Sequence, residues 1–244
     1  MLTNFKFKMQ QVFEMSDLGQ IFYFIGMEKA FALKILNKFS MQNCKTTSKS
    51  VAIREKLSSQ GDFEKVSEST YRSLVGCFLY LTATRPNIIF SVSLLSRFMH
   101  CCNEKHFQTA KRVLRYIKGT LSYGMMFTKA ESIKLIGYAD SDWAGSIDDM
   151  KSTSRYLFTL GSAIFCWSSK KQTIVAQSTA KAEYVAAAGA VNQAIWLRKI
   201  MADLNQHQKE AIEINYDNQS AVAIAKKSSV PWENETLQDQ ISLC

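Results

Sequence analysis

Apolar residues recur at helical spacing through the first half of the chain. The spacing predicts a helix over 71–82, in which Leu74, Phe78 and Leu81 share the buried face. Further helices are expected over 29–39, 87–99 and 104–118. Residues 43–69 are polar and rich in Ser, Thr and Lys, which is typical of a loop or linker. The first half is therefore predicted to be mainly helical.

After Gly119 the pattern changes from helical to alternating. Three runs with this pattern predict antiparallel strands, over 133–139, 156–160 and 162–167, and Gly145 and Gly161 mark the connections. The later elements are expected to be a long alanine-rich helix over 179–204, a strand over 211–216 and a short helix over 219–226. This order predicts a layered α/β unit. The boundary is placed at 128–132, which divides the chain into 1–127 and 128–244.

Composition narrows the class of protein. A chain of 244 residues with 47% hydrophobic content can bury one good core or two small ones. No apolar run approaches the roughly 18 residues of a membrane span, and the first residues lack the apolar core of a signal peptide. An intracellular protein is therefore expected, with its compartment and oligomeric state left open. The six cysteines form no CxxC pair and have no nearby His at zinc-finger spacing, which indicates neither disulfides nor zinc.

The charge balance suggests an acidic partner. The formal net charge is +9 and the pI is about 9.2, and nucleic acid is the commonest acidic partner of such a chain. Lys111, Arg115 and Lys118 fall on one face of the expected helix over 104–118, where they could follow a phosphate backbone. A basic helix face is also an ordinary solvated surface, so both interpretations stay open.

Three carboxylates fall at the ends of expected elements. Asp140 ends the first strand, Glu183 lies in the first turns of the long helix, and Asp217 ends the fourth strand. Oxygen ligands suit Mg²⁺, and two such ions about 4 Å apart can activate water and stabilise the leaving oxygen of a phosphodiester. Each carboxylate also has a structural explanation, as a turn residue, a first-turn helix acid or a helix cap. Taken together they favour phosphodiester hydrolysis.

Short motifs surround these carboxylates. They are Gly-Tyr-Ala-Asp-Ser-Asp-Trp-Ala-Gly at 137–145, Lys-Ser-Thr-Ser at 151–154, Trp-Ser-Ser-Lys-Lys-Gln at 167–172, Ala-Glu-Tyr at 182–184, Trp-Leu-Arg at 196–198 and Tyr-Asp-Asn-Gln-Ser-Ala at 216–221. This set resembles the ribonuclease H domain of copia-type LTR retrotransposon Pol polyproteins, most like those of plants. Upstream, 15–19, 23–26 and 71–86 resemble the end of the reverse transcriptase and its connecting region.

The resemblance implies a fold and an activity. The fold would be an α/β, ribonuclease H-like mixed sheet with helices, preceded by a mainly helical remnant of the reverse-transcriptase thumb or connection. The activity would be hydrolysis of the RNA strand of an RNA–DNA hybrid during reverse transcription, with two Mg²⁺ ions held by Asp140, Glu183 and Asp217. The phosphates would be held by Lys111, Arg115, Lys118, Lys170 and Lys171.

The sequence also departs from the family pattern. It contains no Tyr-x-Asp-Asp polymerase motif. Asp142 is a weaker candidate for a metal-binding carboxylate and is expected to be a turn residue. Arg155 stands where the family usually has Gly, and a positive φ there would cost roughly 1 kcal/mol. Lys181 stands where Glu often completes a capping box with Ser178.

The last residues depart most. Residues 230–240 do not resemble the segments that supply the family's fourth carboxylate. A nuclease unit truncated at its C-terminus is therefore expected, with impaired or lost activity. Two other functions stay open: a non-enzymatic nucleic-acid-binding module and an inert product of a decayed element.

Overall fold

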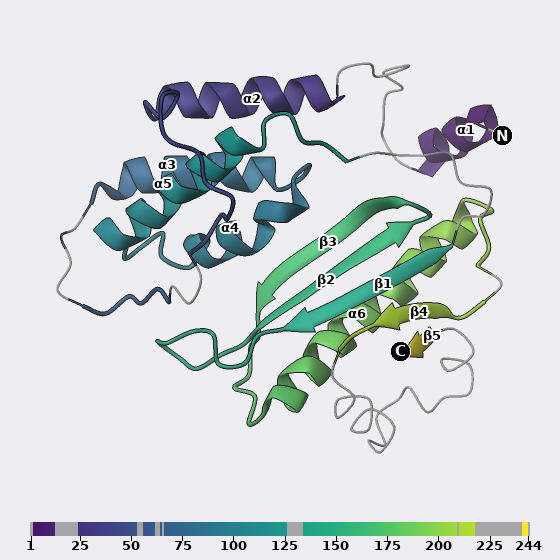
Figure 1. The fold of residues 1–244 in the computed structure, drawn as a ribbon. Helices are drawn as coiled ribbons and strands as arrows, with labels where there is room; N and C mark the ends of the chain where they lie inside the picture. Colours follow the sequence, from purple (N-terminus) through teal and green to yellow (C-terminus); the bar gives the residue numbers. More distant parts are fainter. Residues whose placement is uncertain are drawn as a thin grey trace.

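A computed structural model describes residues 2–12, 24–52, 56–61, 64, 66–125, 134–208, 210–217 and 241–243. Its elements form a helical part followed by a sheet with one long helix (Figure 1). The helical part contains α1 (Leu2–Val12), α2 (Phe24–Lys38), α3 (Glu68–Leu81), the 3₁₀ turn η1 (Pro86–Ile88), α4 (Ile89–Ser96) and α5 (Glu104–Gly119). The mixed α/β architecture predicted from the sequence is confirmed.

The helical part has a core of its own. Tyr71, Leu74 and Phe78 of α3 are fully buried, together with Leu114 and Ile117 of α5. Helix α3 begins three residues before the expected start, because the Ser67 hydroxyl accepts a hydrogen bond from the Thr70 amide and caps the helix. The helix expected over 87–99 is shorter than predicted. It opens as the 3₁₀ turn at Pro86, and α4 ends at Ser96.

The sheet part contains β1 (Leu135–Ser141), β2 (Thr153–Leu160), β3 (Ala163–Lys171), α6 (Thr179–Asp203), β4 (Ile212–Asn215) and the short β5 (Ile241–Leu243). The strand order is β3-β2-β1-β4-β5. Strands β1, β2 and β3 are antiparallel, as predicted, whereas β4 runs parallel to β1 and β5 parallel to β4. Gly161 has a φ of 61° in the tight β2–β3 turn, a conformation that favours glycine.

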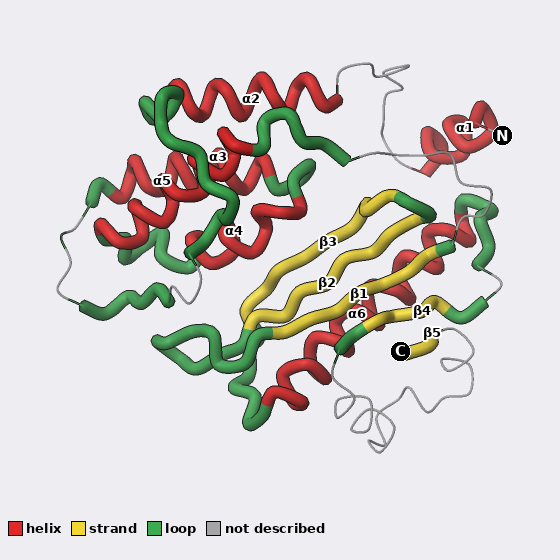
Figure 2. Tube along the Cα trace, in the orientation of Figure 1, coloured by secondary structure: helices red, strands yellow, loops and turns green. Residues whose placement is uncertain are grey.

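Helix α6 covers one face of this sheet (Figure 2). Side chains alternate between the faces of a strand, so Leu135 and Ala139 of β1 pack on α6, while Tyr138 and Asp140 lie on the opposite face. Gly137 faces α6 at a crowded point, because a Cβ there would lie 2.6 Å from the Phe158 ring. Asp140 is therefore displayed on the face of the sheet that α6 leaves open.

The helical part contacts that same open face at its β3 side. Trp167 Nε1 donates a hydrogen bond of 2.9 Å to the Thr82 carbonyl, and Arg97 Nη2 donates one of 2.9 Å to Thr153 Oγ1. Helix α4 packs against β3, so the two parts are in direct contact. The expected boundary at 128–132 and the expected helix over 219–226 lie outside the described residues. None of the described helices is both long enough and apolar enough to cross a membrane.

Candidate functional site

Asp140 and Asp217 are brought together by parallel pairing. Strands β1 and β4 pair through Ile136 with Glu213 and Tyr138 with Asn215. Asp140 lies two residues beyond the last paired residue of β1, and Asp217 lies two residues beyond the end of β4, so both lie at the same end of the two strands. Both carboxylates are exposed at the carboxyl ends of neighbouring parallel strands. This edge of the sheet therefore carries two negative charges.

Glu183 reaches the same edge from helix α6. Ser178 caps that helix by accepting a 3.2 Å hydrogen bond from the Lys181 amide, which places Glu183 in the first turns. Its side chain is only 4% exposed. Glu183 Oε1 accepts a 3.2 Å hydrogen bond from the Ser141 amide at the end of β1, whereas the buried Oε2 has no hydrogen-bond partner among the described residues.

The charges of Asp140 and Asp217 act on the buried Glu183 carboxyl group. The pKa of Glu183 is raised to about 7, mainly by burial and also by the charges of Asp140 and Asp217, against the lowering effects of the Ser141 amide and Arg155. A cation bound at this carboxyl group would favour its charged form and lower its pKa. The oxygen donor set and the unpartnered Oε2 fit a hard divalent cation such as Mg²⁺.

Asp140 already has a cationic neighbour. Arg155 pairs with Asp140 across β1 and β2, and its Nη2 lies 2.7 Å from Asp140 Oδ2. Arg155 is in an extended strand and does not have a positive φ, so the strain expected from its replacement of a glycine does not arise. As the described side chains lie, no three His, Cys, Asp or Glu residues form a group that could hold a metal ion.

Asp142 has a structural role in the β1–β2 connection. Its Oδ1 accepts a 2.7 Å hydrogen bond from the Thr153 amide, at the start of β2. Gly145 makes room for this carboxylate, because a Cβ at that position would collide with it. The prediction that Asp142 is a turn residue is confirmed.

Gln172 is a buried connection between three elements that the sequence did not reveal. Its Nε2 lies within hydrogen-bond distance of Ser141 Oγ on β1 (3.3 Å), Ser154 Oγ on β2 (2.9 Å) and the Ala182 carbonyl on α6 (2.9 Å). The side chain is 6% exposed. Gln172 thereby fixes the first turn of α6, which carries Glu183, against the end of β1.

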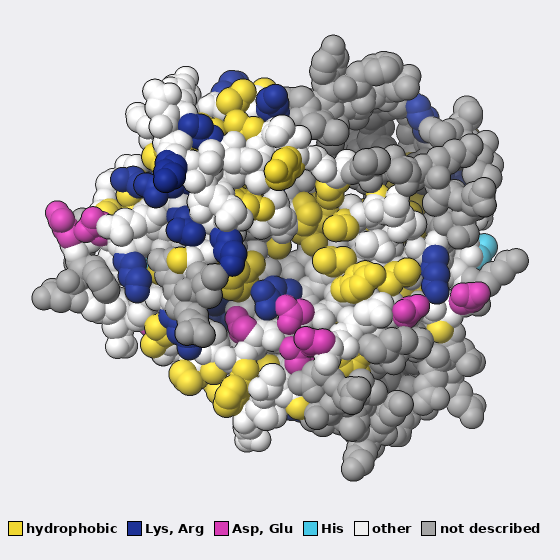
Figure 3. Space-filling model, in the orientation of Figure 1, with side chains coloured by type: hydrophobic (Ala, Val, Ile, Leu, Met, Phe, Trp, Pro, Cys, Tyr) yellow, Lys and Arg dark blue, Asp and Glu magenta, His cyan; other side chains and the backbone are white. Residues whose placement is uncertain are grey.

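The predicted basic residues of α5 differ in their surroundings. Lys111 and Arg115 are exposed, with the Lys111 ammonium 4.8 Å from the Phe107 ring centroid. Lys118 Nζ donates a 2.7 Å hydrogen bond to the Cys44 carbonyl. Figure 3 shows Lys and Arg side chains spread over the helical part, on the same view that displays acidic side chains near the ends of the strands.

Lys170 and Lys171 also differ from each other. They are neighbours on β3, so their side chains point to opposite faces of the sheet. Lys170 is exposed. Lys171 Nζ donates a 2.8 Å hydrogen bond to Asp149 Oδ2, and this contact is the main reason that the pKa of Asp149 falls to about 2.

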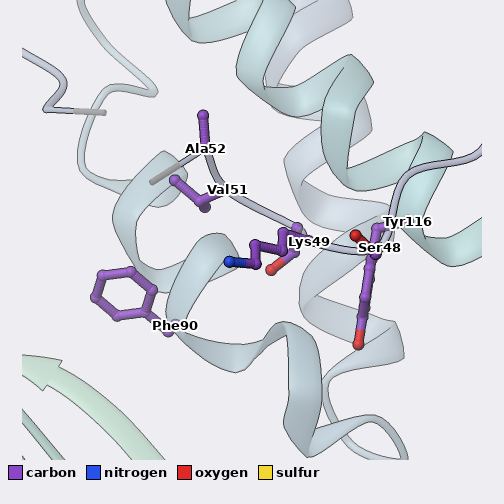
Figure 4. A pocket seen from close by; sticks show the side chains of 7 residues that line it. Ser48, Lys49, Val51, Ala52, Phe90 and Tyr116 are labelled. Carbon is purple, nitrogen blue, oxygen red and sulfur yellow. The ribbon is translucent and has the colours of Figure 1, made fainter. Parts of the chain in front are cut away.

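A hollow of about 470 Å³ lies in the helical part (Figure 4). Phe90 of α4 lines it, and the Arg155 guanidinium lies 5.1 Å from the centroid of the same ring. Its lining consists of Ser48, Lys49, Ser50, Val51, Ala52, Phe90 and Tyr116. Phe90 therefore contacts both the hollow and Arg155. Arg155 in turn pairs with Asp140 at the end of the sheet that carries Asp140, Glu183 and Asp217, which we call the carboxylate edge.

No family model matches the chain. The chain is similar to the retrovirus-related Pol polyprotein from transposon TNT 1-94 of Nicotiana tabacum, with 34% identity over 252 residues that cover 93% of this chain and 19% of the polyprotein. Similarity to the retrovirus-related Pol polyprotein from transposon RE1 of Arabidopsis thaliana is 33% over 233 residues, covering 91% of this chain and 16% of the polyprotein. The chain spans less than a fifth of the length of these two relatives.

A shorter relative is matched over most of its own length. It is an uncharacterized mitochondrial protein of Arabidopsis thaliana, 34% identical over 209 residues that cover 80% of this chain and 86% of that protein. The similarity therefore includes both the helical part and the sheet part.

Proposed function

Since the chain belongs to the family of copia-type retrotransposon Pol polyproteins, we propose that its sheet part is a ribonuclease H-like unit that cleaves the RNA strand of an RNA–DNA hybrid. The observation that supports the proposal is the position of Glu183, which is hydrogen-bonded to the end of β1 and is acted on by the charges of Asp140 and Asp217. The helical part would be the reverse-transcriptase end and connecting region that precede the nuclease in such polyproteins.

Within this proposal, some residues would bind the metal and others hold the metal ligands in position. Asp140, Glu183 and Asp217 would hold Mg²⁺, which when bound supplies activation of the attacking water and stabilisation of the leaving oxygen. The Ser141 amide holds Glu183 Oε1 in place and leaves Oε2 for the cation. Gln172 keeps the Glu183 helix against β1, so the carboxylate does not have to be ordered when substrate binds.

Cleavage of an RNA–DNA hybrid by the purified chain in Mg²⁺ tests the proposal. Asp140→Asn keeps the side-chain size but removes the charge, so cleavage is expected to fall about hundredfold or more. Asp203→Asn is the matched control, because Asp203 is exposed at the far end of α6 and should leave the rate unchanged. Equal rates for wild type and Asp140→Asn would contradict the assignment of Asp140.

A second function is non-enzymatic binding of nucleic acid. The observation that favours it is the engagement of Asp140 by Arg155, beside a helical part with the exposed Lys111 and Arg115. Under this proposal the chain binds the hybrid in a salt-sensitive manner but the Asp140→Asn substitution changes nothing. Absence of both binding and cleavage would instead favour the inert product of a decayed element.

The exposed cations of α5 are expected to contact the phosphates of a bound duplex. The double variant Lys111→Gln, Arg115→Gln removes two exposed cations, so the slope of log binding constant against log salt should fall by about 2 for a duplex. Fluorescence anisotropy with a labelled hybrid at several salt concentrations measures the slope. Lys199→Gln is the control, because Lys199 is exposed on α6, which covers the other face of the sheet. A double variant with the wild-type slope would show that α5 does not contact phosphates.

A further inference from the structure

We propose that Arg155, held in place by Phe90, is an internal cation that competes with divalent metal for Asp140 and so limits the metal affinity of the carboxylate edge. The inference rests on the proposed function, because it assumes that Asp140 is a metal ligand. It goes further by assigning a role to a contact between the helical part and the sheet part. The same contact would keep metal occupancy low while the two parts are packed together.

The position of Arg155 is dictated by strand register. Arg155 stands directly opposite Asp140 in the antiparallel β1–β2 pair, with both side chains on the open face of the sheet. The Nη2–Oδ2 distance of 2.7 Å is that of a charge-assisted hydrogen bond. A guanidinium stays charged at all physiological pH values, so only movement of the side chain can free Asp140.

Phe90 restricts that movement. Its ring lies under the Arg155 guanidinium at 5.1 Å, within the range of a cation–π contact. Phe90 belongs to α4, and the Arg97–Thr153 hydrogen bond fixes the end of this helix to the sheet. The hydrogen bond from Trp167 to the Thr82 carbonyl fixes the segment that precedes α4. Arg155 is therefore held from two sides, by Asp140 on the sheet and by Phe90 on the helical part.

The competition follows from the charges. A metal ion at Asp140 would have to displace the guanidinium or sit close to it, and both changes oppose binding. Arg155 does not neutralise the whole edge, however. Glu183 Oε2 is buried without a hydrogen-bond partner in the part of the chain that the structure describes, and Asp217 adds a further negative charge. A divalent ion is still attracted to the edge, but more weakly than if Asp140 were free.

Calorimetric titration of the full chain with Mg²⁺, without nucleic acid, measures the effect directly. Arg155→Gln removes the charge and keeps a polar side chain, so the Mg²⁺ dissociation constant is expected to fall about tenfold, the equivalent of about 1.4 kcal/mol. Arg155→Lys retains a cation and should remain close to wild type. Phe90→Leu removes the ring and should shift the constant in the same direction by a smaller factor.

Lys134→Gln is the matched control for net charge. Lys134 forms an ion pair with Glu213, with Nζ 3.3 Å from Oε2, next to the opposite end of β1. Its substitution removes one positive charge from the same sheet and should change the Mg²⁺ constant less than twofold. If Lys134→Gln and Arg155→Gln changed the Mg²⁺ dissociation constant equally, the change would be due to net charge and not to the Arg155–Asp140 contact, and the proposal would be overturned.

The remaining outcomes separate the inference from the proposed function. Unchanged or undetectable Mg²⁺ binding in Arg155→Gln overturns the inference, whether or not the wild type cleaves hybrid. Tighter binding in Arg155→Gln that is lost on adding Asp140→Asn supports the inference, even if no variant cleaves and the proposed function fails. Should Arg155→Gln not fold, as judged by circular dichroism, the Phe90→Leu titration decides, and a constant equal to wild type overturns the proposal.

Discussion

Replacing Glu183 with Gln is expected to stabilise the chain above neutral pH while lowering hybrid cleavage about a thousandfold. The two effects have one cause. Glu183 is buried next to Asp140 and Asp217, so its charged form is unfavourable in the folded protein, yet the proposed reaction requires that form. A neutral Gln removes the electrostatic cost and the metal ligand together. Loss of activity with a gain in stability is the mark of a functional residue rather than of a core residue.

The pH dependence of this gain follows from the raised pKa of Glu183, about 7 in the folded chain against an ordinary value of 4.5. Below pH 4.5 both states hold the proton. Between about 4.5 and 7 the unfolded chain releases it and the folded chain keeps it, so wild-type stability falls as pH rises. The full difference is about 3 kcal/mol and is reached above pH 7.

Urea unfolding of wild type and Glu183→Gln, from pH 4.5 to 8 without divalent metal, measures the difference in unfolding free energy. The advantage of the Gln variant should grow with pH and then level off. Glu210→Gln, at an exposed position away from the carboxylate edge, should stay within about 0.5 kcal/mol of wild type. A Glu183→Gln advantage that is absent at pH 8 would contradict the assigned environment of Glu183.

The elements that carry Asp140, Glu183 and Asp217 were predictable because their patterns are local. Alternation identified β1 and β4, and the alanine-rich run identified α6 almost to its last residue. What periodicity could not provide is the parallel pairing of β1 with β4, which places Asp140 and Asp217 at the same end of neighbouring strands. That pairing joins segments far apart in the chain. The sequence indicated only that carboxylates at the ends of elements can converge, and the resemblance to a known family implied the same site.

The features that escaped prediction depend on long-range register or packing. The Asp140–Arg155 pair requires the β1–β2 register, and the Phe90 contact requires the docking of α4 on the sheet. Lys118 and Lys171 were expected to hold phosphates, but whether a lysine already contacts protein groups is decided by its neighbours in space. In the structure Lys118 contacts a carbonyl and Lys171 a carboxylate. The prediction that all five basic residues contact phosphate stays a prediction.

Gln172→Glu is expected to destabilise the chain by about 3–5 kcal/mol. The Gln172 amide group donates toward Ser141, Ser154 and the Ala182 carbonyl, whereas a carboxylate has no proton to donate. Its charge would also be buried on the edge where Glu183 is already costly to ionise. The substitution therefore replaces a donor with an unpaired buried charge.

Gln172→Met separates the loss of the donor from the added charge. Met has a similar length and no charge, and the serine oxygens lose only an accepted hydrogen bond, so the expected cost is only about 1–2 kcal/mol. Urea unfolding at pH 7 measures both variants, and Mg²⁺-dependent hybrid cleavage reports on the placement of Glu183. Equal unfolding free energies for the Glu and Met variants would mean that position 172 is not the buried connection described. A Met variant that is stable but cleaves at least about tenfold more slowly would show that Gln172 positions Glu183, because a purely structural residue would change stability and leave the rate of the folded protein intact.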